Sequence, residues 1–377
     1  MNWFKKTLLH EYTFLGMLGI FLVLRLIYVV SRDIFSSGPD APYYAIAPVE
    51  FAKYGFWSDQ IQGAPYYPIG YPVILSTFVE LGGTNWILFA QIFQVLVSIA
   101  TIWIVYKISS VFFKKEISLA IGFIFLLKPA FIPMSGQAMY EPLIMFTFYA
   151  YLLLILKEIS STPKLLRIIG AGVLAGITAT IHPRTIPWIL VIQLLAYRRL
   201  RFKPSLIFFG AFLTPVLLII VRNGLAFQEW SLATAGSIFL PALKSGNFGE
   251  ILKSGFVNAA YFWSPSSGDA KRATWFHNWT FYHEIKSVTD STTLVLVLAI
   301  FVATFSLITW LYGVRVLIQS DPIIGKIVLY VPLIAWATDF FTSGDSRHRL
   351  VVIPLLLMGQ VWAVIDLTKK FRPSRIE

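Results

Sequence analysis

The sequence has 377 residues, of which 57% are hydrophobic and 13% charged, and its mean hydropathy is +0.71. This composition excludes an ordinary soluble domain and predicts an integral membrane protein. Cysteine is absent, which excludes disulfides, thiolate nucleophiles and cysteine-ligated metals. The net charge of +12 is typical of cytoplasmic loops and of contact with anionic lipids, so we expect no nucleic-acid partner.

Apolar segments follow one another along the chain. A helix that crosses the hydrocarbon core needs about 20 mostly apolar residues. The first segment is too long for a signal peptide and is predicted to be a retained helix. The sixth is short and contains Pro187, which predicts a tilted, broken or half-buried helix. The predicted spans are residues 12–30, 84–106, 117–134, 140–156, 165–181, 185–197, 204–221, 292–314, 325–341 and 350–367. They predict a single all-α membrane domain over residues 1–377, with about ten transmembrane helices.

The distribution of Lys and Arg predicts the orientation of these helices. If Lys5 and Lys6 are cytoplasmic, alternation places most basic loops and the basic tail on the same side, as the positive-inside rule requires. Both termini are then cytoplasmic. The outer side receives two long loops, residues 31–83 and 222–291, and three short turns. We expect a bacterial inner or plasma membrane protein with its site on the periplasmic or exterior face.

The first outer loop, residues 31–83, is rich in aromatic residues. Its segments "APYYAIAPVEFAKYGFW" and "IGYPVILSTFVELGG" are typical of short amphipathic helices at the membrane interface. The chain has no internal repeat, which counts against a carrier built from two related halves.

One acidic residue of this loop, Asp40, lies between two prolines in "SSGPDAPYYAIA". By itself, Gly-Pro-Asp is ordinary turn chemistry. The context favours a function, because the tyrosine pair Tyr43 and Tyr44 follows at once and "YYPIGYP", which contains Tyr67, comes later in the loop.

A second acidic residue, Glu141, precedes a proline at the predicted start of a helix in "MYEPLIMF". An acid in the first turn complements the helix dipole, and proline is favoured there. A glutamate that faces an outer cavity could equally bind sugar hydroxyls or a cation. Both interpretations stay open.

Basic residues also occur on the predicted outer side, against the positive-inside bias. Arg184 lies in "TIHPRTIPW", and Arg347, His348 and Arg349 precede the last span in "SGDSRHRLVVIP". Such residues can extend toward lipid phosphates. Because arginine is suited to bidentate phosphate recognition, we favour a phosphate-binding role for the pair Arg347 and Arg349.

Taken in order, these motifs resemble the GT-C glycosyltransferases, which use polyprenyl-phosphate-linked sugars; protein O-mannosyltransferases and lipid A aminoarabinose transferases are similar. A first helix with Arg25 leads to "DAPYY" and "YYPIGYP". "YEPL" is similar to the family's Thr-Glu-Pro, and "HPRT" follows it. "VRNGLAFQEWSLATAG" resembles the family's Arg-Asn segment, and "SRHRLVVIP" its Arg-Tyr-Arg-Leu-Pro. The family's first-loop Asp-Glu is Asp40-Ala41 here, so the second carboxylate is missing.

The resemblance implies a GT-C-type bundle with amphipathic helices in the outer loops. It implies a polyprenyl-phosphate-linked sugar as donor and a glycan, lipid or protein hydroxyl as acceptor, with inversion at the sugar. Asp40 would be the general base, and Arg347 and Arg349 would bind the lipid phosphate. The remaining expected substrate contacts are Tyr43, Tyr44, Tyr67, Glu141, Arg184, Arg222 and His348. The sequence identifies no definite cofactor, and a divalent metal, Mg²⁺ or Mn²⁺, is left open.

Two alternatives remain. An O-antigen ligase or polymerase-like enzyme also couples polyprenyl carriers with outer arginines, but it would not depend on a first-loop aspartate. A non-enzymatic polyprenyl-lipid carrier or flippase would need charged or broken helices at the membrane midplane, and the predicted spans contain few such groups apart from Arg25 and Lys128.

Overall fold

The computed structural model is helical throughout the part of the chain that it describes, with α-helices and short 3-10 turns and no strand. The described residues are 11–31, 35, 41–127, 135–233, 249, 292–340 and 348–371. The predicted all-α fold is therefore confirmed. The chain forms two compact units, one of Met1–Ile186 with Tyr197–Ala235 and one of Pro187–Ala196 with Gly236–Glu377.

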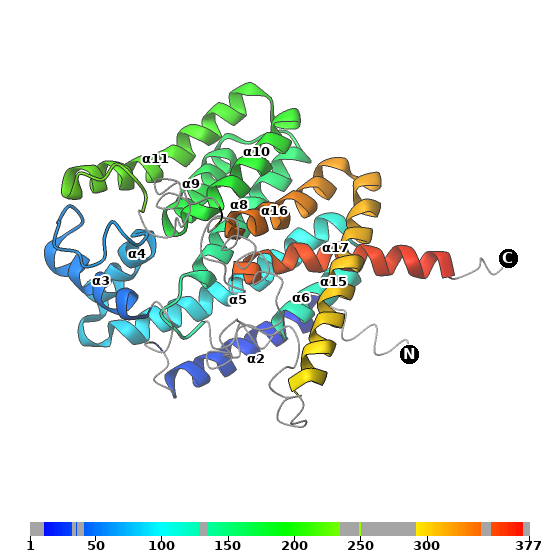
Figure 1. Cartoon of the computed structure of the whole chain (residues 1–377), viewed down its shortest axis with the longest axis horizontal. Helices are drawn as coiled ribbons and strands as arrows, with labels where there is room; N and C mark the ends of the chain where they lie inside the picture. Colours follow the sequence, from blue (N-terminus) through cyan, green and yellow to red (C-terminus); the bar gives the residue numbers. More distant parts are fainter. Residues whose placement is uncertain are drawn as a thin grey trace. The chain divides into compact units, whose positions relative to one another are not determined.

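The helices match the predicted segments closely (Figure 1). In the first unit they are α2 (Glu11–Val30), α3 (Ala41–Tyr54), α4 (Gly70–Gly82), α5 (Trp86–Phe112), α6 (Lys115–Leu126), α8 (Glu141–Ile159), α9 (Leu165–Ile181) and α11 (Phe202–Phe227). The second unit contains α15 (Thr292–Ser320), α16 (Pro322–Phe340), α17 (His348–Phe371) and the middle of α10 (Ile186–Leu200). The two segments predicted as interfacial helices are α3 and α4.

Five segments of the described chain have the length and apolar composition needed to cross a membrane. They are Glu11–Val30, Gly70–Phe112, Glu141–Ile159, Phe202–Phe227 and Val351–Thr368. The second of them joins α4 to α5 through a short 3-10 turn, Gly83–Asn85. These segments are those of an integral membrane protein, as the composition predicts.

Of the three alternatives for the helix at Pro187, tilted, broken or half buried, the structure excludes only the break. Pro187 lies in the first turn of α10, which begins at Ile186 and continues unbroken for 15 residues. A proline is tolerated there because the first-turn N–H groups have no acceptor within the helix. The same reasoning applies to Pro142 in the first turn of α8.

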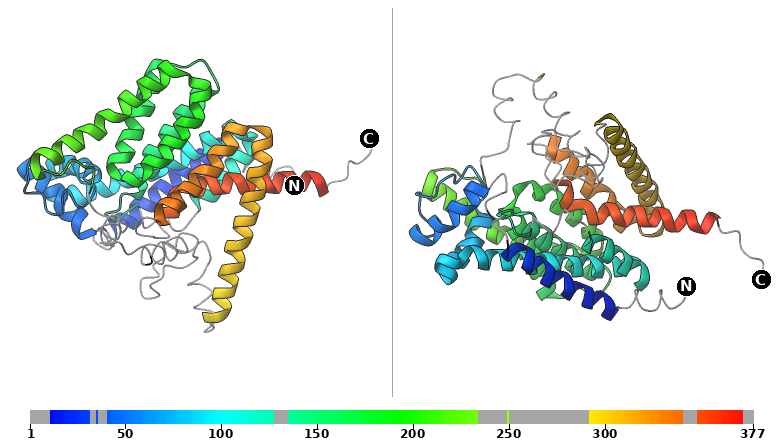
Figure 2. Two further views of the ribbon diagram at one scale, coloured as in Figure 1. Left: turned by 45° about the horizontal axis from the view of Figure 1, so that its top comes forward. Right: turned by 90° about the horizontal axis from the view of Figure 1, so that it is seen from below.

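The first unit is held together by close helix contacts. α9 packs against both α8 and α11, and α5 packs against α8 and α6 (Figures 1 and 2). Gly172 and Gly176 on α9 permit the contact with α11, because a Cβ at these positions would lie 2.5 Å from Phe208 O and 2.4 Å from Phe212 O. Small residues four apart are the usual means of close helix packing in membranes.

A buried arginine connects α2 to its neighbours. Arg25 is only 1% exposed. Its Nη1 donates to Ser98 Oγ on α5 at 2.7 Å, and its Nη2 donates to Leu126 O at the end of α6 at 3.4 Å. Figure 2 shows α2 running alongside these two helices. The C-terminal carbonyls of α6 carry a partial negative charge that favours a cation at this point.

The second unit is a three-helix packing in which α15 contacts α16 and α17. α15 and α17 cross very closely, because Gly313 has the backbone of Gly359 directly against it. Tyr312 donates a hydrogen bond to Asp366 Oδ2 at 2.5 Å, which ties the same two helices together.

Candidate functional site

Aromatic rings from several predicted motifs meet in the first unit. Tyr43 on α3 stacks on Tyr67, with ring centroids 4.6 Å apart, and contacts Tyr44 at 5.1 Å. Tyr44 in turn makes edge contacts with Tyr71 on α4 at 5.0 Å and with Tyr140 at 5.7 Å. The predicted substrate-contact residues Tyr43, Tyr44 and Tyr67 are thus neighbours in space.

The same chain of contacts continues into the "HPRT" turn. Tyr140, which directly precedes Glu141, contacts the ring of His182 at 5.0 Å. We call the six residues Tyr43, Tyr44, Tyr67, Tyr71, Tyr140 and His182 the aromatic cluster. It joins motifs that are about 140 residues apart in sequence, from the first outer loop to the end of α9.

A glycine brings α4 against the end of α9. A Cβ at Gly70 would lie 2.6 Å from the carbonyl carbon of Thr180 and 2.7 Å from the nitrogen of Ile181. Because real Cβ atoms do not approach backbone so closely, only glycine allows this contact. Gly70 is the glycine of "YYPIGYP". The absence of a side chain at this position lets the motif lie beside "HPRT" at the end of α9.

Two glutamines on α5 bind the turn that leads to Glu141. Gln91 Nε2 donates to Gly136 O at 2.9 Å, and Gln94 Nε2 donates to Gln137 O at 3.0 Å. Gln94 Oε1 also accepts a hydrogen bond from the Tyr71 hydroxyl at 2.8 Å, which links the turn to the aromatic cluster. The sequence interpretation did not identify these glutamines. Their signal is a pair of amides three residues apart within an otherwise apolar span.

The start of the first outer loop contacts the same turn. Phe35, five residues before Asp40, accepts a backbone hydrogen bond from Ala138 N at 2.9 Å. Its ring packs edge-on against Trp86 at the start of α5, with centroids 5.4 Å apart. Asp40 itself lies outside the described residues.

Glu141 is the first residue of α8 and is almost completely buried, with 1% exposure. It lies at the N-terminal end of α8, where the helix dipole interacts favourably with an acidic side chain. The carboxylate also interacts electrostatically with the Tyr71 phenol. Glu141 therefore lies beside the aromatic cluster.

Arg222 is fully buried in the last turns of α11, which continues beyond it to Phe227. Its Nε donates to Phe56 O at 2.8 Å and its Nη2 to Ser58 O at 2.6 Å. Nη1 donates to Asn223 Oδ1 at 3.0 Å. Arg222 thus holds the part of the first outer loop that follows α3.

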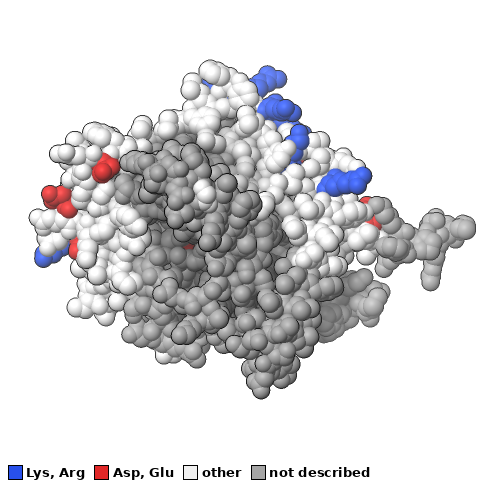
Figure 3. Space-filling model, in the orientation of Figure 1, with Lys and Arg blue, Asp and Glu red and all other residues white. Residues whose placement is uncertain are grey.

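The adjacent Asn223 extends this connection. Its Nδ2 donates to Ser231 O at 2.8 Å, so it binds the segment that follows α11. Carboxylates of Glu50, Asp59 and Glu229 are carried by the same elements, and Figure 3 shows acidic side chains over the end of the first unit where α3 lies. Arg222 and Asn223 therefore join the residues after α3 and the residues after α11 to one helix end.

The Tyr43 hydroxyl is buried and makes no hydrogen bond with the residues that the structure describes. Burial raises the pKa of the Tyr43 phenol above its ordinary value, and the nearby charge of Arg222 opposes this only in part. Tyr43 is therefore neutral at physiological pH.

The remaining predicted basic residues are distributed as follows. Arg184 lies in a short 3-10 turn, Pro183–Thr185, which is closed by a hydrogen bond from Thr185 Oγ1 to His182 O at 2.8 Å. His348 and Arg349 lie in the first turn of α17, but their side chains are outside the description, and Arg347 is outside it entirely.

Within the described ranges, no three or more His, Asp or Glu side chains are grouped to hold a metal ion.

Comparison with known proteins found no matching protein-family model and no matching curated protein. Among solved structures, the chain is similar to the archaeal oligosaccharyltransferase AglB from Archaeoglobus fulgidus, solved in complex with an inhibitory peptide and a dolichol-phosphate. The TM-score is 0.49 and the sequence identity 14%. The similarity covers 98% of this chain but only 51% of that protein, so this chain spans about half of its length.

Proposed function

We propose that the protein is a GT-C-type glycosyltransferase that moves a sugar from a polyprenyl phosphate to an acceptor hydroxyl on the outer face of the membrane. The observation that supports this most is the aromatic cluster. "APYY", "YYPIGYP", "MYEPL" and "HPRT", which are four of the ordered motifs of the resemblance, contribute residues to one continuous set of contacts.

In the proposed reaction Asp40 is the general base. It removes the proton from the acceptor hydroxyl as that oxygen attacks the anomeric carbon of the donor sugar. The bond from this carbon to the phosphate oxygen breaks with inversion, and the electron pair leaves with the polyprenyl phosphate. A positioned base contributes about 10²–10⁴-fold to such a step.

The leaving group is a phosphate of low basicity, so it needs no proton. Arg347 and Arg349 stabilise its charge, with Arg184 assisting, through charge-assisted hydrogen bonds. Glu141, His348 and the tyrosines Tyr43, Tyr44 and Tyr67 orient the sugar or the acceptor. Arg222 acts on binding through the first loop, because its guanidinium already donates hydrogen bonds to Phe56 O, Ser58 O and Asn223 Oδ1.

The experiment that tests this function uses the purified protein in liposomes. A labelled undecaprenyl-phosphate sugar is supplied with an extract of bacterial membrane lipids and glycans as acceptors. We expect the label to appear in a new product while undecaprenyl phosphate is released in equal amount. Movement of the intact donor across the bilayer without its consumption would instead identify a carrier and refute the proposal.

A further inference from the structure

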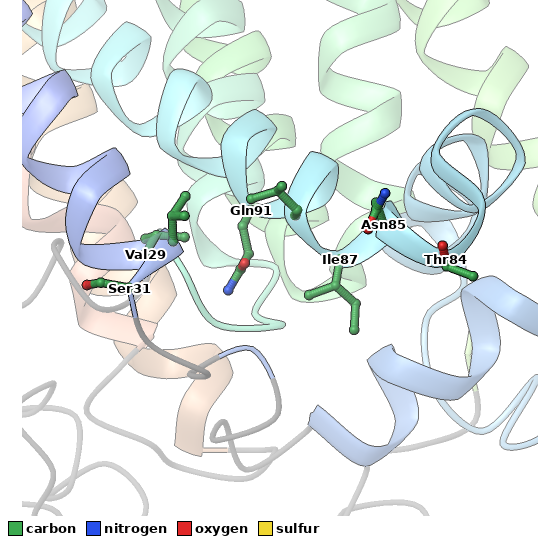
Figure 4. Close-up of a pocket in the computed structure, with 8 residues that line it drawn as sticks. Val29, Ser31, Thr84, Asn85, Ile87 and Gln91 are labelled. Atoms are coloured by element: carbon green, nitrogen blue, oxygen red, sulfur yellow. The ribbon is translucent and has the colours of Figure 1, made fainter.

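A groove lies between the end of α2 and the start of α5, with a volume of about 400 Å³ (Figure 4). Sites for small molecules usually have volumes of about 300–1,000 Å³. Half of its described lining is apolar and half is uncharged and polar. The polar side chains are Ser31, Thr84, Asn85 and Gln91. None of the predicted substrate residues lines it.

One polar group of the groove is buried and oriented by the fold. Gln91 is only 5% exposed, and its Nε2 is held by Gly136 O at 2.9 Å. Its Oε1 accepts no hydrogen bond from the described residues. In Figure 4 the side chain extends from α5 into the space between Val29 and Ile87. An acceptor that lines the groove in this position is suited to a hydrogen-bond donor that enters it.

Asn85 is a second polar group that is available to a ligand. It occupies the N-cap position of α5, yet its side chain makes no capping hydrogen bond. Asparagine at this position usually caps the first turn. Its amide therefore keeps its N–H donors and its oxygen acceptor. Sugar hydroxyls can bind such an amide because they donate and accept hydrogen bonds at once.

The charge of the groove argues against a phosphate. Among its described lining residues there is no Lys, Arg or His and also no Asp or Glu. Phosphates are recognised by arginine or lysine. Uncharged amides and hydroxyls instead match ligand groups that both donate and accept hydrogen bonds, such as the hydroxyls of a sugar ring.

Apolar faces continue from the groove along both helices. Val30 lines the groove and is 59% exposed, and Ile27 and Val23 extend the same exposed face of α2 at helical spacing. On α5 the exposed side chains Leu88 and Leu96 lie on one face two turns apart. In a membrane these faces contact acyl chains, so a ligand of the groove can keep its chains in the lipid.

We propose that this groove binds the headgroup of an uncharged glycolipid, with the sugar at Gln91 and Asn85 and the acyl chains along α2 and α5. Under the proposed function, on which this part rests, the glycolipid is the acceptor. The groove shares Gln91 with the turn that leads to Glu141, and Ser31 lies at the start of the loop that contains Asp40.

The test measures binding without any donor, so that it is independent of transfer. The full-length protein in detergent is titrated with glucosyl-diacylglycerol, and bound lipid is counted by native mass spectrometry. We expect Leu88→Trp, which fills the groove, to weaken binding at least about ten-fold. Asn85→Ala removes one hydrogen-bonding group and should weaken binding about five-fold.

Phe89→Trp is the matched control, because Phe89 is the next residue on α5, is 47% exposed and does not line the groove. It should bind glucosyl-diacylglycerol like the parent protein. Equal binding by the Leu88→Trp and Phe89→Trp variants would overturn the proposal. So would displacement of the glycolipid by phosphatidylglycerol or farnesyl phosphate at equal concentration, because an anionic lipid would then be the ligand.

The two proposals fail in different ways. Sugar transfer that is unaffected by Leu88→Trp would leave the transferase intact and refute the acceptor groove. Glycolipid binding that is lost in Leu88→Trp, together with no transfer from any donor, would support the groove and refute the transferase.

Discussion

The guanidinium of Arg222 binds the backbone of Ser58 at 2.6 Å, across 164 residues of sequence. Together with the bond to Phe56 O, this contact ties the residues that follow α3 to the last turns of α11. The loop therefore depends on a helix that follows it by more than a hundred residues.

Replacing Arg222 by lysine should release this part of the loop. Lysine carries the same charge but cannot reach two carbonyls and Asn223 at once. We expect a loss of about 1–3 kcal/mol in the free energy of unfolding and faster hydrogen exchange over residues 55–62. Arg198→Lys, at an exposed position on α10, is the control and should change neither quantity. Unchanged exchange in Arg222→Lys would contradict the role of this arginine.

Asp40→Asn tests the general base. The amide keeps the size of the side chain but cannot accept a proton, so transfer should fall about 10²–10⁴-fold. Donor binding should stay unchanged, as measured by retention of labelled lipid. Asp59→Asn, an exposed residue of the same loop, is the control. Full transfer by the Asp40→Asn variant would remove Asp40 from this role.

Gln94 and Tyr71 should be energetically coupled. Gln94→Leu leaves the Tyr71 hydroxyl and Gln137 O without their amide partner, which should cost about 1–3 kcal/mol of stability. In the double variant with Tyr71→Phe, the two losses should not add, and the coupling should be about 0.5–3 kcal/mol. Chemical unfolding in detergent micelles measures the free energy of unfolding of the parent, the two single variants and the double variant. Strict additivity would mean that the hydrogen bond contributes nothing.

Gly70→Ala should separate α4 from α9. The added methyl would lie 2.6 Å from the backbone of Thr180, and overpacking of this kind costs about 1–3 kcal/mol. Gly210→Ala on α11 is the control, since no atom lies within 4 Å of the added Cβ. In a helix that change should be neutral or stabilise by up to about 1 kcal/mol. Melting temperatures that fall equally in both variants would refute the close contact.

Tyr43→Phe should be harmless at neutral pH and protective at alkaline pH. Its hydroxyl has no described partner, so its loss removes no hydrogen bond. Because burial raises the folded-state pKa, the unfolded chain loses this proton first, and stability falls as the pH rises above about 10. The phenylalanine variant has no phenol to ionise, so it does not show this fall in stability. Melting curves between about pH 8 and pH 11 should therefore diverge from the parent, whereas Tyr66→Phe, at a 54% exposed position, should follow it.

The helices could be predicted because their signals are local. Leu165–Ile181 coincides with the predicted fifth span, and Glu141–Ile159 begins one residue from its predicted start. Apolar length is a property of each segment by itself. At Pro187 the sequence left a broken helix open, because the effect of a proline depends on where the helix begins.

The site could be predicted only in part. Tyr43, Tyr44, Tyr67 and Glu141 were predicted from motif context, whereas Tyr71 and Tyr140 were not. Gln91 and Gln94 were missed because the acceptors they bind lie about 43 residues or more away in sequence. The substrate role that the resemblance suggested for Arg222 stays a prediction, and the structure adds its hydrogen bonds to Phe56 O, Ser58 O and Asn223 Oδ1.

By itself the sequence determined the membrane class, the positions of the helices and the motifs of a candidate site. All of these follow from hydropathy, charge and residue order. Only the tertiary structure decided which motifs meet: Gly70 admits the backbone of α9, and the ring of Tyr44 then joins Tyr71 to Tyr140. The physical reason is that long-range contacts depend on the packing of helices that no single segment encodes.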